Sequence, residues 1–289
     1  MRLEPEGKGN SLKKRSKKLL LAGGIAAALL VWAGLDTSLT VQTYTVESGK
    51  VEVPVRLALL TDLHSCDYGE GQRELLDAVE EQDPDLVLLG GDIVDDGPEM
   101  PEERALATVE ALAERWPTYY VTGNHEYRTG RVEEIKELLA GRGAVVLEGT
   151  CALVTVGEQT LQICGVDDPA VGAAVWQSQL EDVTAALEGD VCSILLSHRP
   201  ERVADYTGRG FDLVLSGHAH GGQWRIPLLG AGLIAPNQGL FPRYAGGTYD
   251  LEGTTLVVSR GLARESTRIP RLYNPPEVVM VDLVPETKK

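Results

Sequence analysis

Six short apolar runs, rich in Val, Leu and Ile, limit the possible folds of this 289-residue chain more than any other feature. Near-continuous apolar runs of this length are typical of strands that are covered on both faces. Between the early runs lie stretches in which apolar residues recur at helical spacing. Such alternation predicts an α/β fold. The predicted strands are 55–60, 85–89, 118–122, 193–197, 212–216 and 255–259.

The segments between these runs carry helix start and stop signals. Residues 101–116 begin with a proline and acidic residues, as the first turn of a helix does. Residues 131–143 end at glycines, which are frequent just after a helix. Residues 71–85 and 176–189 also carry apolar residues at helical spacing. We expect four helices here, and additional antiparallel strands at 151–164 and 277–285.

The N-terminus has the composition of a membrane signal. A basic cluster at 13–18 precedes residues 19–35, which carry no charge. Such a run beside a positive flank is typical of a membrane segment whose basic end stays in the cytoplasm, and at about 1.5 Å per residue it is just long enough to span. A buried core helix is the alternative, and the adjacent basic cluster argues against it. A second alternative is an export signal cleaved near Val31 and Ala33.

These observations divide the chain into four parts. We expect the folded domain to lie on the extracytoplasmic side of the cell membrane, behind a single-pass anchor. Residues 40–54 are expected to lead from a tether into a first hairpin. The parts are a cytoplasmic N-terminus (1–18), the anchor (19–35), the tether (36–52) and the domain (53–285).

The charge of the chain is unevenly spread. The formal net charge is −16, whereas residues 1–18 carry seven Lys or Arg and two Glu, which leaves −21 on the rest. The net negative charge of residues 19–289 argues against nucleic-acid binding, because binding to a phosphate backbone needs a positive protein surface. A small phosphate ester stays compatible, since bound metal ions can offset its charge locally.

Four cysteines without CxxC spacing fit neither a disulfide-dense scaffold nor a zinc ribbon. Cys151 and Cys164 flank a predicted hairpin. They face each other if Gly157 and Glu158 form a two-residue turn, and a disulfide is then expected in an exported protein. A turn one residue longer on each side would separate them, so the sequence leaves this pairing open.

Polar side chains follow five of the predicted strands, and all five histidines of the chain are among them. In open α/β sheets, ligands bind beyond the carboxyl ends of the strands. We therefore expect these side chains to converge on one crevice. They are Asp62, His64, Asp92, Asn124, His125, Glu126, His198, His218 and His220.

This mixture of side chains indicates metal. Imidazole, carboxylate and amide groups together suit Zn, Mn, Fe or Ni, and they are too many for one ion. Alternate residues of an extended chain project to the same side, so the D-x-H and H-x-H spacings would point both partners at the ions. The glycines beside them, such as Gly123 and Gly217, would let backbone approach without a Cβ clash.

The motifs TDLH, GGDIVDD, GNHE, LSH and GHAH, in that order, resemble those of the calcineurin-like metallophosphoesterase superfamily. The chain is most similar to its bacterial membrane-associated phosphodiesterase branch, over about residues 53–284. The resemblance implies a four-layer αββα sandwich and a site with two divalent transition-metal ions.

The resemblance also implies a role for each motif residue. One metal would be held by Asp62, His64 and His220, and the other by Asn124, His198 and His218. Asp92 would bridge the two, and His125 would protonate the leaving oxygen.

The expected function is hydrolysis of a phosphodiester, or a related phosphate ester, at the cell envelope by metal-activated hydroxide attack. The anchor favours a lipid-linked substrate by location alone. Two alternatives stay open. A non-catalytic metal-binding domain would be expected to lose ligands, whereas this chain keeps them all. A phosphoprotein phosphatase would need a cationic groove, which the net negative charge of residues 19–289 disfavours.

Overall fold

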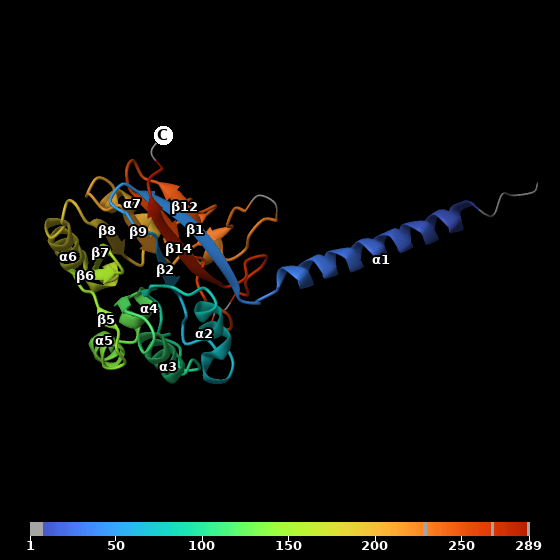
Figure 1. The fold of residues 1–289 in the computed structure, drawn as a ribbon. Helices are drawn as coiled ribbons and strands as arrows, with labels where there is room; N and C mark the ends of the chain where they lie inside the picture. Colours follow the sequence, from blue (N-terminus) through green and yellow to red (C-terminus); the bar gives the residue numbers. More distant parts are fainter. Residues whose placement is uncertain (1–7, 228–229, 267–268, 288–289) are drawn as a thin grey trace, which may run out of the picture.

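Two six-stranded sheets lie face to face in the computed structural model, which describes residues 8–227, 230–266 and 269–287. Helices cover the outer face of each sheet, so the layers run α, β, β, α (Figure 1). The first sheet has the order β1 (Thr40–Ser48), β14 (Glu277–Pro285), β2 (Val55–Leu60), β3 (Leu86–Gly90), β4 (Thr118–Val121), β5 (Val145–Val146). The second has the order β12 (Gly247–Asp250), β13 (Thr255–Val258), β9 (Leu213–Ser216), β8 (Cys192–Leu196), β7 (Gln159–Gly165), β6 (Thr150–Val156).

The described helices divide between the two outer layers and the N-terminus. Residues of α2, α3 and α5 pack on the first sheet, and residues of α6 and α7 pack on the second. A two-stranded ribbon, β10 (Ile234–Ala235) with β11 (Gly239–Leu240), lies outside both sheets. The helices are α1 (Lys8–Gly34), α2 (Arg73–Glu80), α3 (Glu102–Ala113), α4 (Asn124–Arg128), α5 (Val132–Gly141), α6 (Ala173–Ala185) and α7 (Val203–Tyr206).

The apolar runs form the central strands because both of their faces are buried. In β2, Leu57 and Leu59 face the core between the sheets, whereas Ala58 and Leu60 face the core beneath the helices. This two-residue alternation is the ordinary geometry of a strand, and here each side meets an apolar layer. The expectation of doubly covered strands in an αββα sandwich is confirmed.

The predicted tether is wrong for residues 40–48. They form β1, which pairs in parallel with β14 along its whole length, from Thr40 beside Glu277 to Ser48 beside Pro285. The expected first hairpin does not form, because β14 lies between β1 and β2 and pairs with β2 in antiparallel fashion. Strand β14, which is distant in sequence, thus occupies the position beside β1 where the local spacing predicts β2.

The predicted hairpin at 151–164 is confirmed. Strands β6 and β7 are antiparallel, with Gly157 and Glu158 between them, and Cys151 lies directly opposite Cys164. The two cysteines are joined in a disulfide, whereas Cys66 and Cys192 are free and buried. The two-residue turn is what sets this register.

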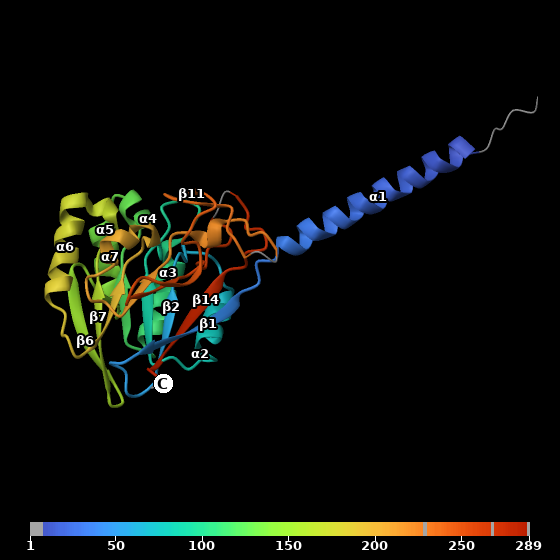
Figure 2. The same ribbon diagram turned by 90° about the horizontal axis from the view of Figure 1, so that it is seen from above.

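Helix α1 extends away from the rest of the molecule (Figures 1 and 2). Its segment Lys17–Gly34 has a mean hydropathy of 1.5, so by length and composition it could cross a membrane. The same segment is only 6% buried against the rest of the protein. Leu19, Leu20 and Trp32 are each more than two-thirds exposed. A helix that is apolar and uncovered by protein is not a core helix.

Candidate metal centre

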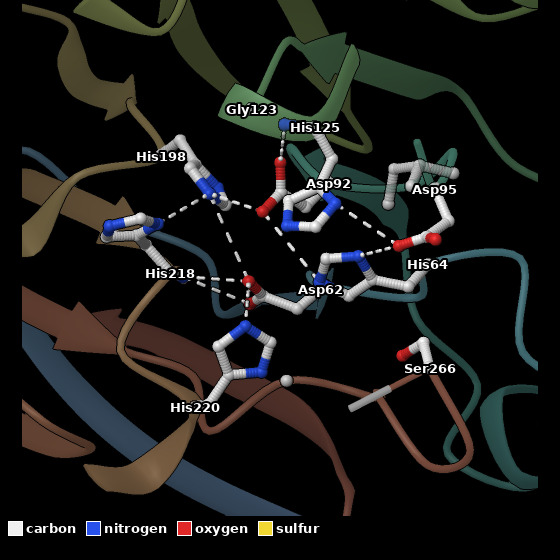
Figure 3. A network of polar contacts seen from close by, with 12 residues as sticks. Asp62, His64, Asp92, Asp95, Gly123, His125, His198, His218, His220 and Ser266 are labelled. Carbon is white, nitrogen blue, oxygen red and sulfur yellow. Dashed lines mark hydrogen bonds and ion pairs between the residues drawn. The ribbon is translucent and has the colours of Figure 1, made fainter. Parts of the chain in front are cut away.

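The carboxyl ends of five strands, three in one sheet and two in the other, meet at one edge of the sandwich (Figure 3). Strands β2, β3 and β4 of the first sheet lead into Asp62, Asp92 and Asn124, respectively. Strands β8 and β9 of the second sheet lead into His198 and His218. The crevice expected from the sequence therefore lies between two sheets, and all the proposed ligands reach it.

The backbone at these strand ends is not extended, so the expected geometry of the D-x-H and H-x-H pairs is wrong. Asp62, His64, His218 and His220 have φ values of 53°, 49°, 63° and 45°, and Asp92 has 52°. Non-glycine residues rarely adopt this left-handed region, and such strain persists mainly where surrounding structure imposes it. Tight turns, and not strand alternation, aim these side chains at the centre.

One group of candidate ligands consists of Asp62, His64 and His220, whose ligand atoms lie within 4.8 Å of one another. His220 Nε2 lies 3.6 Å from Asp62 Oδ1. His64 directs Nδ1 to Asp95 Oδ1 at 2.8 Å, which leaves Nε2 for the centre. Holding one ring nitrogen against a carboxylate is how proteins orient a metal-binding imidazole.

A second group, Asp92, His198 and His218, meets the same distance criterion. His198 Nδ1 donates to Gly90 O at 2.8 Å, and His218 Nε2 lies 2.8 Å from Asn237 Oδ1. The remaining nitrogens, His198 Nε2 and His218 Nδ1, lie 3.2 Å apart. Each ring is again fixed by one nitrogen and directs the other inward.

The remaining expected ligand, Asn124, is buried beside the second group. Its side-chain oxygen faces His218 Nδ1 at 2.9 Å, so two acceptors meet there, which suits a shared cation. Its short helix α4 has Gly123 as its N-cap, where an added Cβ would lie 2.2 Å from Asp92 Oδ1. Glycine is required there because the start of α4 closes directly on that carboxylate.

Asp92 lies between the two groups. Its Oδ2 is 3.1 Å from His198 Nε2 and 3.8 Å from His64 Nε2, while Oδ1 accepts from the His125 backbone at 2.8 Å. His198 Nε2 is also 4.0 Å from Asp62 Oδ1. The two groups are therefore adjacent, and this carboxylate faces both.

The donor set fits divalent metal ions. His64 Nε2 and Asp92 Oδ2 are buried, lie 3.8 Å apart and have no hydrogen-bond partner among the described residues. Buried polar atoms are ordinarily satisfied, so unpaired ones that converge indicate a missing partner. Imidazole nitrogen with carboxylate oxygen is the donor chemistry of transition-metal ions.

The electrostatics at the second group also favour a cation. Burial opposes protonation of His198, but Asp92 outweighs it and raises the pKa of His198 to about 10. Burial, together with His198 and Arg199, lowers the pKa of His218 to about 3, so this imidazole is neutral. The carboxylates thus stabilise a positive charge between the rings, which a proton or a metal ion can supply.

His125 lies at the rim and contacts a pair of carboxylates, those of Asp95 and Asp96. Its Nδ1 is 3.2 Å from Asp95 Oδ1 and also contacts Asp96. Burial opposes protonation of His125, but the hydrogen bond to Asp95 outweighs it and raises the pKa. Asp95 also orients His64, and its only sequence signal was its place three residues after Asp92.

Glu126 acts as an acceptor for backbone. It is fully buried and accepts from the N–H groups of Gly123 at 2.8 Å, Ile93 at 2.7 Å, and Asp92 and Val94 at 3.1 Å. This single carboxylate joins the end of β3 to the start of α4, so it positions the loops that carry Asp92 and Asn124.

A cavity of about 500 Å³ opens over the centre. Arg128, one turn after Asn124 in α4, lines it, and Nη1 lies 3.0 Å from His125 Nε2. Nothing in its sequence context had distinguished Arg128 from a surface residue. The lining is His64, Asp95, Asp96, Gly97, Pro98, His125, Arg128, His220 and Ser266.

Comparisons with known proteins identify the family of the chain. A family model described as calcineurin-like phosphoesterase matches residues 55–222. An uncharacterized metallophosphoesterase of Campylobacter jejuni is 30% identical over 275 residues, which cover 90% of this chain and 68% of that protein. The phosphodiesterase YaeI of Escherichia coli is 30% identical over 236 residues, covering 80% and 83%.

Two further similarities concern the fold and the domain context. A transmembrane protein with a metallophosphoesterase domain from Danio rerio is 31% identical over 225 residues, covering 72% of this chain and 51% of that protein. A 5′-nucleotidase precursor from Thermus thermophilus superposes with a TM-score of 0.50 at 16% identity, covering 80% of this chain and 54% of that one. At that identity the structural match shows the fold alone.

Proposed function

Because the chain belongs to the calcineurin-like phosphoesterase family, and is thus a metal-dependent phosphoric ester hydrolase, we propose that it is a binuclear phosphodiesterase of the cell envelope. The observation that carries the proposal is the pair of adjacent ligand groups, in which Asp92 of the second group also faces His64 of the first. A relative that is named a phosphodiesterase supports the choice of diester.

The proposed ligands follow the two groups. Asp62, His64 and His220 would hold one divalent ion; His198, His218 and Asn124 would hold the other, with Asp92 as the bridge. When bound, such ions supply Lewis-acid polarisation of the phosphate ester and a water of lowered pKa. Mn, Fe, Zn and Ni are all compatible with these donors.

The residues at the rim would handle the substrate. Asp95 and Asp96 face Nδ1 of His125 and favour its doubly protonated form, whose proton on Nε2 can pass to the leaving oxygen. The Arg128 guanidinium lines the same cavity, and it can donate to a phosphate oxygen. Asp92 would be both the bridge and the carboxylate that fixes the His125 backbone.

The proposed location is the extracytoplasmic side of the membrane. The apolar part of α1 would anchor the chain, preceded by the basic cluster of residues 13–18 in the cytoplasm. The Cys151–Cys164 disulfide supports this side, since disulfides persist in oxidising compartments. We propose a folded domain from residue 40 to 285 behind the anchor, with its phosphate-ester substrate at the membrane.

The test uses the full chain in detergent, stripped of metal and assayed with bis-p-nitrophenyl phosphate before and after Mn²⁺ is added. Activity that requires the metal is expected, together with a metal content of two ions per chain by mass spectrometry.

His198→Ala and His218→Ala are expected to bind less metal. Full occupancy in both variants would contradict the ligand assignment, and an inactive protein with two ions bound would favour a binding domain.

A further inference from the structure

Exposed apolar side chains gather on two loops of the folded domain. Five others, Val41, Val53, Val145, Leu153 and Val175, are scattered singly over the described residues, which is ordinary for a protein surface. The two loops, in contrast, carry every exposed Trp, Phe and Ile of the described folded domain. We call this set the apolar face: Trp224, Ile226, Ile234, Leu240, Phe241 and Ile269.

The apolar face is tied to the end of the candidate membrane helix. The backbone N–H of Tyr273 donates to Gly34 O at 2.6 Å, and its hydroxyl donates to Leu30 O at 2.6 Å, inside the apolar span. Trp224 pairs with Leu272 and donates from Nε1 to Pro270 O at 3.0 Å. Both views show these loops beside the C-terminal end of α1 (Figures 1 and 2).

These loops also lack the negative charge that characterises the rest of the domain. The chain has 43 Asp and Glu, yet none lies between Asp212 and Asp250, or between Glu265 and Glu277. The first of these stretches contains Arg225 and Arg243 as its charged residues. Apolar and aromatic side chains with a few arginines and no acids are the composition of a surface that enters a lipid interface.

The same loops reach the metal centre on their inner side. Asn237, between β10 and β11, contacts His218 Nε2 at 2.8 Å, and Asn274 donates to His220 O at 2.7 Å. Ser266, three residues before Ile269, lines the cavity over the centre. The membrane helix, the apolar face and the cavity are therefore parts of one continuous region.

We propose that the apolar face lies in the membrane interface beside α1, and that the centre acts on a phosphodiester carried by a lipid of that membrane. The substrate class rests on the proposed function, whereas the position of the apolar face does not. In this arrangement a lipid headgroup reaches the cavity without leaving the bilayer surface, since the rim of the cavity and the apolar face share a loop.

The position of the apolar face can be measured without any activity. Nitroxide labels would be placed on Phe241→Cys and Ile269→Cys, with Leu153→Cys on β6 as the matched control, in full chain reconstituted in phosphatidylcholine vesicles. Leu153 is 55% exposed, compared with 64% for Phe241 and 53% for Ile269. The native Cys66 and Cys192 are buried and the other two cysteines are joined.

Labels at Phe241 and Ile269 are expected to collide with oxygen more than with a water-soluble nickel chelate, and the Leu153 label to show the opposite. A preference for the nickel chelate at all three positions would overturn the proposal, because the face would then be in water. Low collision with both reagents would also overturn it, since it would indicate burial against protein.

The substrate class is tested with two diesters that share a leaving group. Bis-p-nitrophenyl phosphate is soluble, and dioleoylglyceryl p-nitrophenyl phosphate stays in the vesicles. The double variant Phe241→Ser/Ile269→Ser is expected to lose about tenfold on the lipid diester, since two inserted side chains are removed, and to keep its activity on the soluble one. Leu153→Ser should leave both unchanged.

The outcomes separate the two proposals. No activity on either diester, with lipid-facing labels, would reject the proposed function and leave the membrane surface standing. Activity of the native chain on the soluble diester alone would reject the lipid substrate. Equal losses on both diesters would also reject it, because the apolar face would then affect the catalytic centre itself and not access from the bilayer.

Discussion

At the scale of single residues, the centre depends on how each imidazole is held. His64, His198 and His218 each give one nitrogen to a fixed partner, Asp95, Gly90 or Asn237, and turn the other inward. Such partners set the tautomer and orientation of a ligand before any metal arrives. The left-handed backbone of Asp62, His64, Asp92, His218 and His220 is the conformational cost of this arrangement.

We predict that His125→Ala retains metal but loses turnover, by a factor of about 10²–10⁴, because general acid catalysis contributes that much. The metal content and kcat of the same preparation provide the check. His198→Ala is the control, since it should lose metal as well. Normal turnover in His125→Ala would remove its proposed role as the acid.

A second residue-scale prediction concerns pH. Asp95 raises the pKa of His125 against the effect of burial, so the acid form survives to higher pH in the native chain. In Asp95→Asn that pKa falls, and the alkaline limb of the kcat profile should move to lower pH. In a His125→Ala background the same change should not move the limb. A shift that persists there would assign the limb to another group.

At the scale of elements, the loops that follow the strands carry and position the candidate ligands. Glu126 joins the β3 loop to the start of α4 through four backbone N–H groups, so the carboxylate of Asp92 and the amide of Asn124 move as one unit. At the lateral edge of the second sheet, the disulfide joins two paired residues of the β6–β7 hairpin, whose register is set by its two-residue turn.

We predict that Gly123→Ala disables the centre without removing any ligand. The new Cβ would lie 2.2 Å from Asp92 Oδ1 and 2.4 Å from its backbone nitrogen, so α4 and the β3 loop must separate. Displacement on this scale can cost about 10²-fold in rate. Activity and metal content would be measured against Gly141→Ala as a control, because Gly141 has open space around it and, like Gly123, no positive φ. Equal effects in the two variants would contradict crowding of Asp92 as the cause.

At the scale of the whole molecule, two sheets contribute candidate ligands to one edge, and the candidate membrane helix α1 leads to the same edge. The C-terminal strand β14 lies between β1 and β2, so the residues that follow α1 are held in the first sheet from Thr40 onward. Helix α1 and the centre are thus linked through ordered strands and through Tyr273, and not through a free tether.

We predict that the folded domain lies outside the cytoplasmic membrane. In spheroplasts of a bacterial host, added protease should degrade the domain, and Cys151 and Cys164 should be oxidised on a non-reducing gel. Orientation should depend on the basic cluster, so its reversal to glutamate should leave much of the domain protected and its cysteines reduced. Full protection in the native chain would place the domain in the cytoplasm. The cluster is Lys13, Lys14, Arg15, Lys17 and Lys18.

The sequence by itself determined the apolar strands, the order of the helices and the polar residue types at each strand end. These are local properties: periodicity fixes which faces are buried, and motif spacing fixes which donors follow each strand. The expected site residues lie beside one another at the same edge of the sandwich, and the family that the motifs resemble is the one whose model matches.

Only the tertiary structure decided how those donors meet. The insertion of β14 beside β1, the turns that aim His218 and His220, and the contacts of Asp95 and Glu126 all join residues that are distant in sequence or leave no local pattern. The register of the hairpin, and with it the disulfide, depends on a turn that the sequence left open. Long-range pairing is set by the free energy of the whole packed structure, which local spacing does not encode.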